Sequence, residues 1–211
     1  MIPGMGADTR IYNNIDLLDN DVIPVNWIIP DINDTLTSYA QKLILQYHIS
    51  NNSILIGNSL GGMIAIEIAN MVPISKVILI SSIKTINEAP WYFKLFRNIP
   101  VYKMLPNGLM NTGGVFIKPV FGNMKPDDLW LFKDMLKKSS PVFVKWAMGA
   151  VLKWNNQTIP PNVYHIIGDK DRVFNYKLIK DAIIIKGGTH IMVFDMAKQI
   201  NKLLKTILKK K

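Results

Sequence analysis

The sequence predicts an α/β protein in which a doubly wound, mostly parallel sheet carries an inserted helical segment. Short, nearly continuous apolar runs, typical of strands buried on both faces of a parallel sheet, occur at residues 53–56, 76–81, 162–167 and 182–185. Helical periodicity accompanies these runs at both ends of the chain, most clearly over 193–208. Strands that alternate with helices in this way form sheets whose ligand sites lie at the carboxyl ends of the strands.

The N-terminal part is expected to contribute a short helix, a strand and a longer helix. The short helix is expected near residues 10–14. Residues 21–29 are β-branched and apolar, which predicts a strand, and Pro24 favours the edge of a sheet because proline lacks an N–H. Asp34 or Thr35 then caps a helix whose apolar residues follow helical spacing. These elements precede the first buried strand.

Residues 83–158 interrupt the alternation of strands and helices. The segment is helical in period and rich in aromatic residues, and Pro126 and Pro141 each open a helix. Because it directly follows a strand, the segment is expected to lie over the carboxyl edge of the sheet as a cap; the alternative is a helical extension packed elsewhere. The predicted organisation is a core formed by residues 1–82 and 159–211, with a cap between them.

The composition excludes several kinds of site. None of the 211 residues is cysteine, which rules out disulfides, thiolate nucleophiles and cysteine-ligated metal sites and suits a cytoplasmic location. No apolar run reaches the roughly 18 residues that span a bilayer, and no signal pattern is present. The net charge of +10 would suit nucleic acid, anionic lipid or an acidic carrier protein, but the lysines are spread over helix surfaces and their densest cluster ends the last helix. We therefore expect a solvated surface and no nucleic-acid partner; no pattern indicates an oligomeric state.

A G-x-S-x-G motif at residues 57–61 stands between an apolar β-prone run and a helix-prone run. In this setting the central Ser59 sits on a sharp strand-to-helix turn that lifts its hydroxyl above the carboxyl edge of the sheet. Gly57 and Gly61 keep side chains out of the crowded space around that turn. The motif alone is weak, and the strand before it and the helix after it make it a candidate nucleophile.

A serine nucleophile needs a histidine base, and the chain offers three histidines. His48 precedes the strand that leads to Ser59, on the wrong side of the sheet. His165 lies within an apolar strand, where a buried histidine with satisfied hydrogen bonds is the more frequent case. His190 follows the final strand in a glycine-rich loop at a carboxyl end, which makes it the candidate base.

The order of the candidate groups along the chain resembles that of a known family. A loop with two aspartates follows the run 162–167, so the order is serine, acid, histidine. The chain resembles α/β-hydrolases of the esterase and lipase type. This resemblance implies that the acid occupies the fourth position of the G-x-x-D turn at 168–171, which is Asp171; Asp169 is the alternative, and its other possible role is to cap the turn.

The resemblance also implies an oxyanion hole formed by two backbone N–H groups. One belongs to Leu60, directly after the nucleophile, and the other to Met5, by match of residues 3–5 to the family's H-G-x loop. Pro3 stands where the family usually has histidine, which leaves the amide donor unchanged. The strands that precede this loop in the family are expected to be absent, with the last of them reduced to a stub.

The activity implied is hydrolysis of a small-molecule carboxylic ester or thioester through an acyl-enzyme on Ser59. Aromatic residues of the cap are candidates for an apolar acyl pocket, and those selected are Trp91, Phe116, Trp130 and Trp146. The sequence calls for no cofactor and no metal. A carbon–carbon bond hydrolase of the same fold and a non-catalytic ligand-binding relative remain as alternatives.

Overall fold

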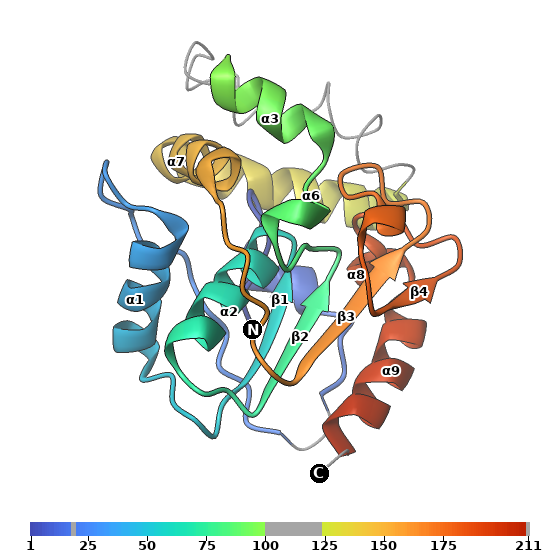
Figure 1. Cartoon of the computed structure of the whole chain (residues 1–211). Helices are drawn as coiled ribbons and strands as arrows, with labels where there is room; N and C mark the ends of the chain where they lie inside the picture. Colours follow the sequence, from blue (N-terminus) through green and yellow to red (C-terminus); the bar gives the residue numbers. More distant parts are fainter. Residues whose placement is uncertain (18–19, 100–123, 210–211) are drawn as a thin grey trace.

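The computed structural model describes residues 1–17, 20–99 and 124–209. Its sheet contains four parallel strands in the order β1-β2-β3-β4, which follows their order in the chain (Figure 1). The strands are β1 (Ile54–Asn58), β2 (Lys76–Ile80), β3 (Val163–Gly168) and β4 (Ala182–Ile185). The prediction of a parallel α/β sheet is confirmed.

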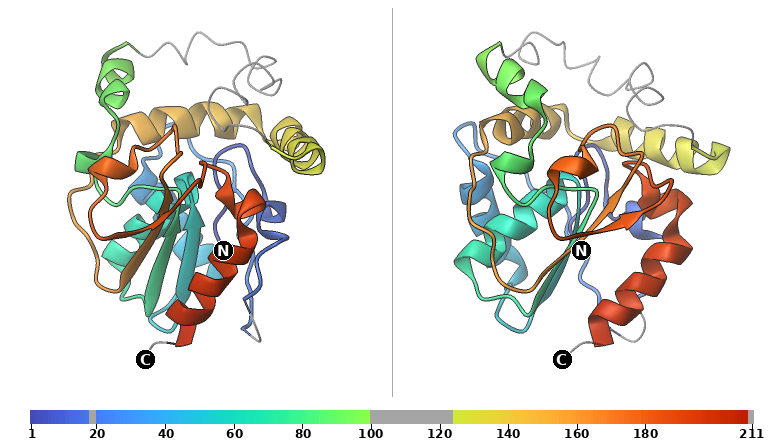
Figure 2. Two further views of the ribbon diagram at one scale, coloured as in Figure 1. Left: turned by 90° about the vertical axis from the view of Figure 1, so that its right-hand side faces the viewer. Right: turned by 45° about the vertical axis from the view of Figure 1, so that its right-hand side comes forward.

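The described helices cover both faces of the sheet and its carboxyl edge. Helices α1 (Leu36–Tyr47) and α2 (Leu60–Met71) pack on one face, and α8 (Met192–Asp195) and α9 (Ala197–Lys209) pack on the other (Figures 1 and 2). Three helices of the inserted segment lie over the carboxyl ends of the strands: α3 (Trp91–Asn98), α6 (Pro126–Lys138) and α7 (Pro141–Lys153). We call these three the cap helices. Short 3-10 helices occur at Thr9–Tyr12, Ile86–Glu88 and Tyr176–Leu178.

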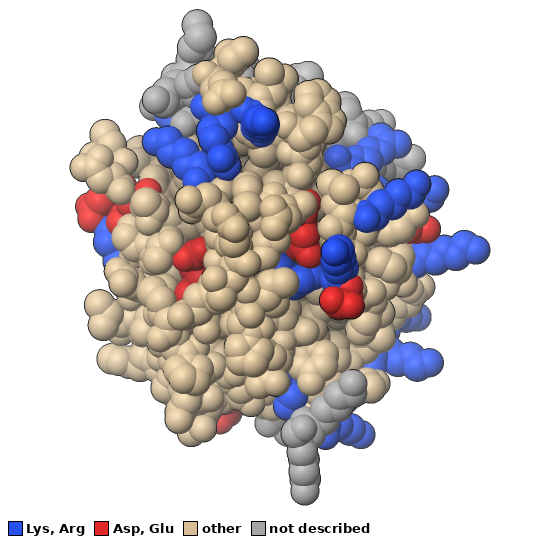
Figure 3. Space-filling model, viewed as in Figure 1, with Lys and Arg blue, Asp and Glu red and all other residues tan. Residues whose placement is uncertain are grey.

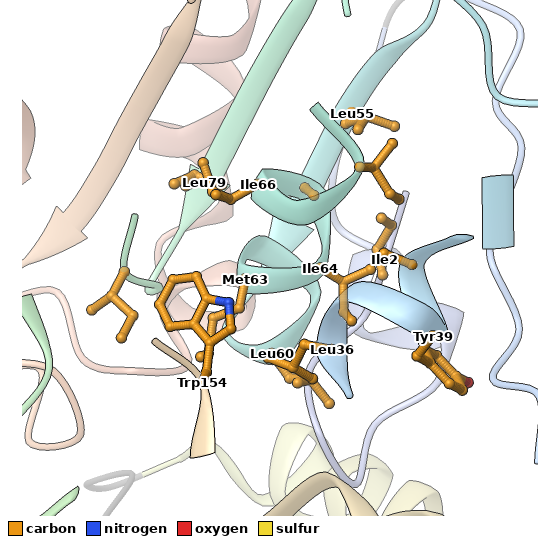
Figure 4. Close-up of a cluster of buried hydrophobic side chains, with 14 of the residues drawn as sticks. Ile2, Leu36, Tyr39, Leu55, Leu60, Met63, Ile64, Ile66, Leu79 and Trp154 are labelled. Carbon is orange, nitrogen blue, oxygen red and sulfur yellow. The ribbon is translucent and has the colours of Figure 1, made fainter. Parts of the chain in front are cut away.

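Strand β2 shows how the continuous apolar runs are used. Val77 and Leu79 join the apolar cluster shared with α1 and α2, whereas Ile78 and Ile80 join the cluster shared with α8 and α9. All four side chains are fully buried, since neighbouring residues of a strand point to opposite faces. Figure 4 shows the first of these clusters around α2, with side chains drawn from the strands, from α1 and from the end of α7.

The expected strand stub consists of a single bridging residue. Ile2 forms an isolated parallel bridge with Gly57. The N–H of Ile2 donates to the carbonyl of Ile56 at 2.8 Å, and its own carbonyl accepts from the N–H of Asn58 at 3.1 Å. The hydroxyl of Tyr12 also donates to this carbonyl, at 2.6 Å. The stub therefore lies directly beside the strand that leads to Ser59.

The strand predicted over residues 21–29 is wrong. The segment is extended but has no ladder, although the N–H of Val25 donates to the carbonyl of Met1 at 2.9 Å. The hydroxyl of Tyr39 on α1 bonds both the N–H and the carbonyl of Ile28, at 2.9 and 2.8 Å. A helix side chain thus takes the place of a neighbouring strand, and sequence periodicity carries no signal for such a bond.

The single helix predicted over 193–208 is interrupted. Met196 has φ −119° and ψ 23°, so the chain bends between α8 and α9. Val193 before the bend and Ile200 after it belong to the same apolar cluster. One continuous apolar stripe can therefore come from two helices, which is why the pattern predicted one. The N-terminal cap of α1, by contrast, is confirmed as Thr35, which forms a capping box with Ser38.

Among the described residues, no helix combines the length and apolar character needed to cross a bilayer. The same part of the chain contains no cluster of three acidic or histidine side chains that could hold a metal ion.

Candidate active site

The turn between β1 and α2 holds Ser59 in a conformation that few non-glycine residues adopt. Its φ is 52° and its ψ is −117°. A Cβ atom on Gly57 would lie 2.3 Å from the carbonyl oxygen of Gly61, so the turn tolerates no side chain there. The N–H of Ser59 donates to Ile80 of β2 at 3.0 Å, and the Ser82 hydroxyl donates to the Ser59 carbonyl at 2.7 Å. Bonds to β2 and to the segment directly after it thus hold the strained turn in place.

The structure brings His190 and Asp171 to this serine. The Nε2 atom of His190 lies 3.0 Å from the Ser59 hydroxyl oxygen, and its Nδ1 atom lies 2.9 Å from Oδ2 of Asp171. The side chain of Asp171 is fully buried and that of His190 is 5% exposed. The other carboxylate oxygen of Asp171 accepts the N–H groups of Val173 and Phe174 at 2.8 and 2.9 Å. These two donors fix the carboxylate, and the carboxylate in turn orients the imidazole.

Asp169 makes a different contact. Its Oδ1 accepts the N–H of Gly187 at 2.6 Å, and the neighbouring N–H of Lys170 donates to the carbonyl of Gly188 at 2.9 Å. Gly168 packs so closely on this loop that a Cβ atom there would lie 2.0 Å from the carbonyl oxygen of Gly188. Asp169 therefore joins the loop after β3 to the loop that carries His190.

The other two histidines lie away from the serine hydroxyl. His165 is buried in β3, with its Nε2 3.0 Å from the carbonyl of Ser82 and its Nδ1 3.2 Å from Nζ of Lys84. Burial, and secondarily the positive charge of Lys84, lower the pKa of His165 to about 3, so its ring is neutral. His48 is exposed and caps the C-terminus of α1 with φ 49°.

The loop and the helix that carry the two N–H groups expected to form an oxyanion hole both lie next to the nucleophile. Leu60 is the first residue of α2, so its N–H has no acceptor within the helix. Gly4, directly before Met5, is packed so closely on the nucleophile that a Cβ atom on it would lie 3.4 Å from Cβ of Ser59. Within the described ranges, neither the N–H of Met5 nor that of Leu60 donates a hydrogen bond.

Three of the four predicted pocket aromatics lie among the described residues, and their role as an acyl pocket stays a prediction. Trp91 and Trp130 are 77% and 68% exposed. Trp146 donates its indole N–H to the carbonyl of Asp34 at 2.8 Å and borders a hollow between residues 30–37 and α7. Phe116 lies outside the described residues.

Sequence reasoning missed an aromatic contact on the histidine itself. The ring of Phe174 meets that of His190 edge to face at 5.5 Å between centroids, and Phe93 of α3 meets Phe174 in the same manner at 6.3 Å. The hydroxyl of Tyr92 on α3 donates to the carbonyl of Val173 at 2.6 Å. One cap helix is therefore tied to the loop that carries the acid. The only available signal was the position of Phe174 three residues after Asp171.

Known structures share this fold at low sequence identity. A thermophilic esterase from Thermogutta terrifontis is 14% identical with a TM-score of 0.69, over 99% of this chain and 88% of its own. An esterase from Exiguobacterium antarcticum is 15% identical with a TM-score of 0.67, over 100% and 92%. A hydrolase from Pseudomonas aeruginosa is 14% identical with a TM-score of 0.70, over 99% and 88%. No curated protein sequence matches significantly.

Identity this low establishes a common fold and no more. The family assignment comes from the sequence itself, because the profile of the alpha/beta hydrolase family matches residues 2–203, nearly the whole chain. The chain belongs to the alpha/beta hydrolase family.

Proposed function

We propose that the protein is a serine hydrolase that cleaves a carboxylic ester or thioester through an acyl-enzyme on Ser59. The observation that carries the proposal is the continuous chain of hydrogen bonds from the Asp171 carboxylate through His190 to the Ser59 hydroxyl, with lengths of 2.9 and 3.0 Å. This is the arrangement that activates a serine hydroxyl as a nucleophile. Two solved esterases that share the fold support the reaction class.

In this proposal each group has a distinct role. Nδ1–H of His190 donates to Asp171, so the lone pair of Nε2 faces the Ser59 hydroxyl and accepts its proton as Oγ attacks the substrate carbonyl. The C=O oxygen becomes negative as the tetrahedral intermediate forms, and the N–H groups of Met5 and Leu60 stabilise it. His190 then gives the proton to the departing alcohol or thiol, which leaves Ser59 acylated. Water attacks the acyl-enzyme with His190 again as base and releases the acid.

The burial of the pair strengthens this mechanism. The Asp171 carboxylate is excluded from water and held by two backbone N–H groups, so it is ready to stabilise the imidazolium that forms on His190. We further propose that residues 83–158 form a cap subdomain over this site. Two observations on the described residues support this. The cap helices lie above the carboxyl ends of the strands, and Tyr92 of α3 donates to the loop that carries Asp171.

Labelling with a fluorophosphonate probe and hydrolysis of p-nitrophenyl esters of increasing acyl length test the proposal. The parent protein is expected to be labelled and active, and Ser59→Ala is expected to lose the label and at least about 10⁴-fold in kcat. Ser75→Ala is the matched control, because Ser75 is exposed at the opposite end of the sheet and should retain both properties. A parent protein that takes up no probe would favour a non-catalytic binder, and a Ser59→Ala variant as active as the parent would overturn the mechanism.

A further inference from the structure

The loop that carries the Met5 amide leaves the sheet immediately after the single bridging residue Ile2. The N–H of Ala7 donates to the carbonyl of Gly4 at 3.1 Å and closes a four-residue turn. Gly6, the third residue of the turn, has φ +75°, the value that a type II turn requires at that position. The sheet therefore fixes the entry to the loop, and other groups must fix the turn itself.

Trp27 holds the far end of this turn. Its indole N–H donates to the carbonyl of Ala7 at 3.0 Å. Its ring stacks on Phe143 of α7, with 4.7 Å between centroids and 29° between planes. Phe143 is only 2% exposed, so the stack belongs to the packed interior. Trp27 thus connects a cap helix directly to the turn that presents the Met5 amide.

The backbone around Trp27 is itself restrained by α1. The N–H of Asn26 donates to the hydroxyl of Tyr47 at 2.8 Å, and the N–H of Ile28 donates to the hydroxyl of Tyr39 at 2.9 Å. The ring of Tyr39 lies in the same buried cluster as Leu60, as Figure 4 shows. The indole is therefore held in position by its neighbours on both sides in the chain as well as by its stack.

A second cap helix contacts the other side of the turn. A Cβ atom on Gly6 would lie 2.8 Å from Cδ1 of Leu136 on α6. Arg10, which also binds Asp8, donates from Nη1 to Asp134 of α6 at 2.6 Å. The turn is thus enclosed between α6 and the pair formed by Trp27 and α7.

We propose that Trp27 is a positioning residue for the oxyanion hole: its indole N–H, pressed against the turn by Phe143, sets where the Met5 amide points. The inference rests on the proposed hydrolase function. In the described part of the chain, Trp27 bonds Ala7 and its ring meets Tyr39 and Phe143, so its effect on the site passes through Ala7 and the turn. An oxyanion hole acts through donors that are fixed before the reaction. Displacing such a donor by a fraction of an ångström destabilises the transition state far more than it weakens the binding of the substrate.

The test is Trp27→Phe, which keeps an aromatic ring beside Phe143 and removes the indole N–H together with one ring of the indole. The control variant below loses the same atoms. The expected result is a fall of about tenfold in kcat for p-nitrophenyl acetate with KM within about twofold. The inhibition constant of phenylboronic acid, which forms a tetrahedral adduct with an oxygen in the hole, should rise by a similar factor. Trp154→Phe is the control, because Trp154 donates its indole N–H to Glu67 at 2.7 Å, away from the turn.

The two variants separate positioning from general loss of packing. The inference is overturned if Trp27→Phe matches Trp154→Phe in kcat and in boronic acid inhibition, whatever the two do to melting temperature. If Trp27→Phe fails to fold, Phe143→Leu provides the same test, because it removes the stacking ring from the other side; parent-like kcat and boronic acid affinity in that variant would equally overturn the inference. Absence of esterase activity in the parent would instead refute the proposed function, so the two failures are distinguishable.

Discussion

At the scale of single residues, the candidate site depends on backbone positions more than on side-chain chemistry. The positive φ of Ser59 is held by two bonds: its N–H donates to Ile80 of β2, and its carbonyl accepts from Ser82, just after that strand. Asp171 and Asp169 are two residues apart in one loop, yet one faces His190 and the other faces Gly187. Identical carboxylates thus acquire different roles from the direction in which the turn points them.

Substituting each aspartate with asparagine distinguishes these roles. Asp171→Asn should lower kcat by about 10⁴-fold, because an amide can hold His190 in the wrong tautomer and does not stabilise an imidazolium. Asp169→Asn keeps an oxygen that can accept from Gly187, so a loss of less than about tenfold is expected. The measurement is kcat for p-nitrophenyl acetate at neutral pH. Equal losses in the two variants would contradict the assignment of Asp171 as the acid.

Ser59 and His190 could be selected from the sequence because each follows an apolar run that predicts a strand. The structure places their side chains within hydrogen-bonding distance, and their catalytic roles stay a prediction. The sequence was not sufficient to find Trp27 or Phe174. Their roles arise from contacts with the inserted segment, across the fold, and no local period predicts which aromatic ring meets which. For the same reason, the sequence could not show that the aromatic side chain of Trp91 lies exposed on α3.

At the scale of elements, the strands of the sheet were predictable and the segment beside the stub was not. Strands β2 and β4 match their apolar runs within a residue. Strand β2 is buried on both faces, as its continuous apolar run predicts, whereas the same prediction is wrong for β4: it is the last strand in the sheet order, and its Ile183 and Ile184 are 39% and 44% exposed. Residues 21–29 have the same composition, but their backbone groups bond with tyrosine hydroxyls of α1. Composition predicts extended backbone there. Whether that backbone becomes a strand depends on whether its N–H and carbonyl groups pair with another strand or with side chains.

Removing these hydroxyls one at a time measures how much a helix stabilises the extended segment. Tyr39→Phe should lower the free energy of unfolding by about 1–3 kcal/mol, because it leaves the N–H and the carbonyl of Ile28 without their partner in a part-buried position. Tyr47→Phe is the matched control: Tyr47 makes the equivalent bonds to Asn26 at an exposed position, where water can replace them. Urea denaturation gives both values, and an equal or larger loss for Tyr47→Phe would contradict this account.

At the scale of the whole molecule, the inserted segment is joined to the sheet by a buried polar network where it leaves β2. The Lys84 ammonium donates to Glu88 and to the carbonyl of Lys180, each at 2.7 Å, and contacts His165 at 3.2 Å. Asn156, where the chain returns towards β3, donates to the carbonyl of Lys84 at 2.9 Å. The two ends of the inserted segment thus meet at one buried lysine beside β3.

The basic side chains are spread over the surface of the molecule. On the face shown in Figure 3, lysine and arginine side chains lie over the cap helices and along the side that carries α9, rather than in one dense patch. Several described basic groups are paired, among them Arg10 with Asp134, Lys42 with Asp34 and Lys205 with Asp16. The absence of a nucleic-acid partner stays a prediction, and this distribution fits it.

The buried network also predicts how stability depends on pH. His165 is neutral in the folded protein with a pKa lowered to about 3, chiefly by burial, whereas an unfolded chain has a histidine pKa near 6.5. Between these values the unfolded state binds a proton that the folded state does not, so the free energy of unfolding falls as pH is lowered through this window, by at most about 1.4 kcal/mol per pH unit. Urea denaturation at several pH values from 4 to 7 should show a shallower slope in His165→Gln than in the parent. His48→Gln, at an exposed position, should keep the parental dependence of unfolding free energy on pH. Equal slopes for the parent and His165→Gln would contradict a lowered pKa of His165 in the folded protein.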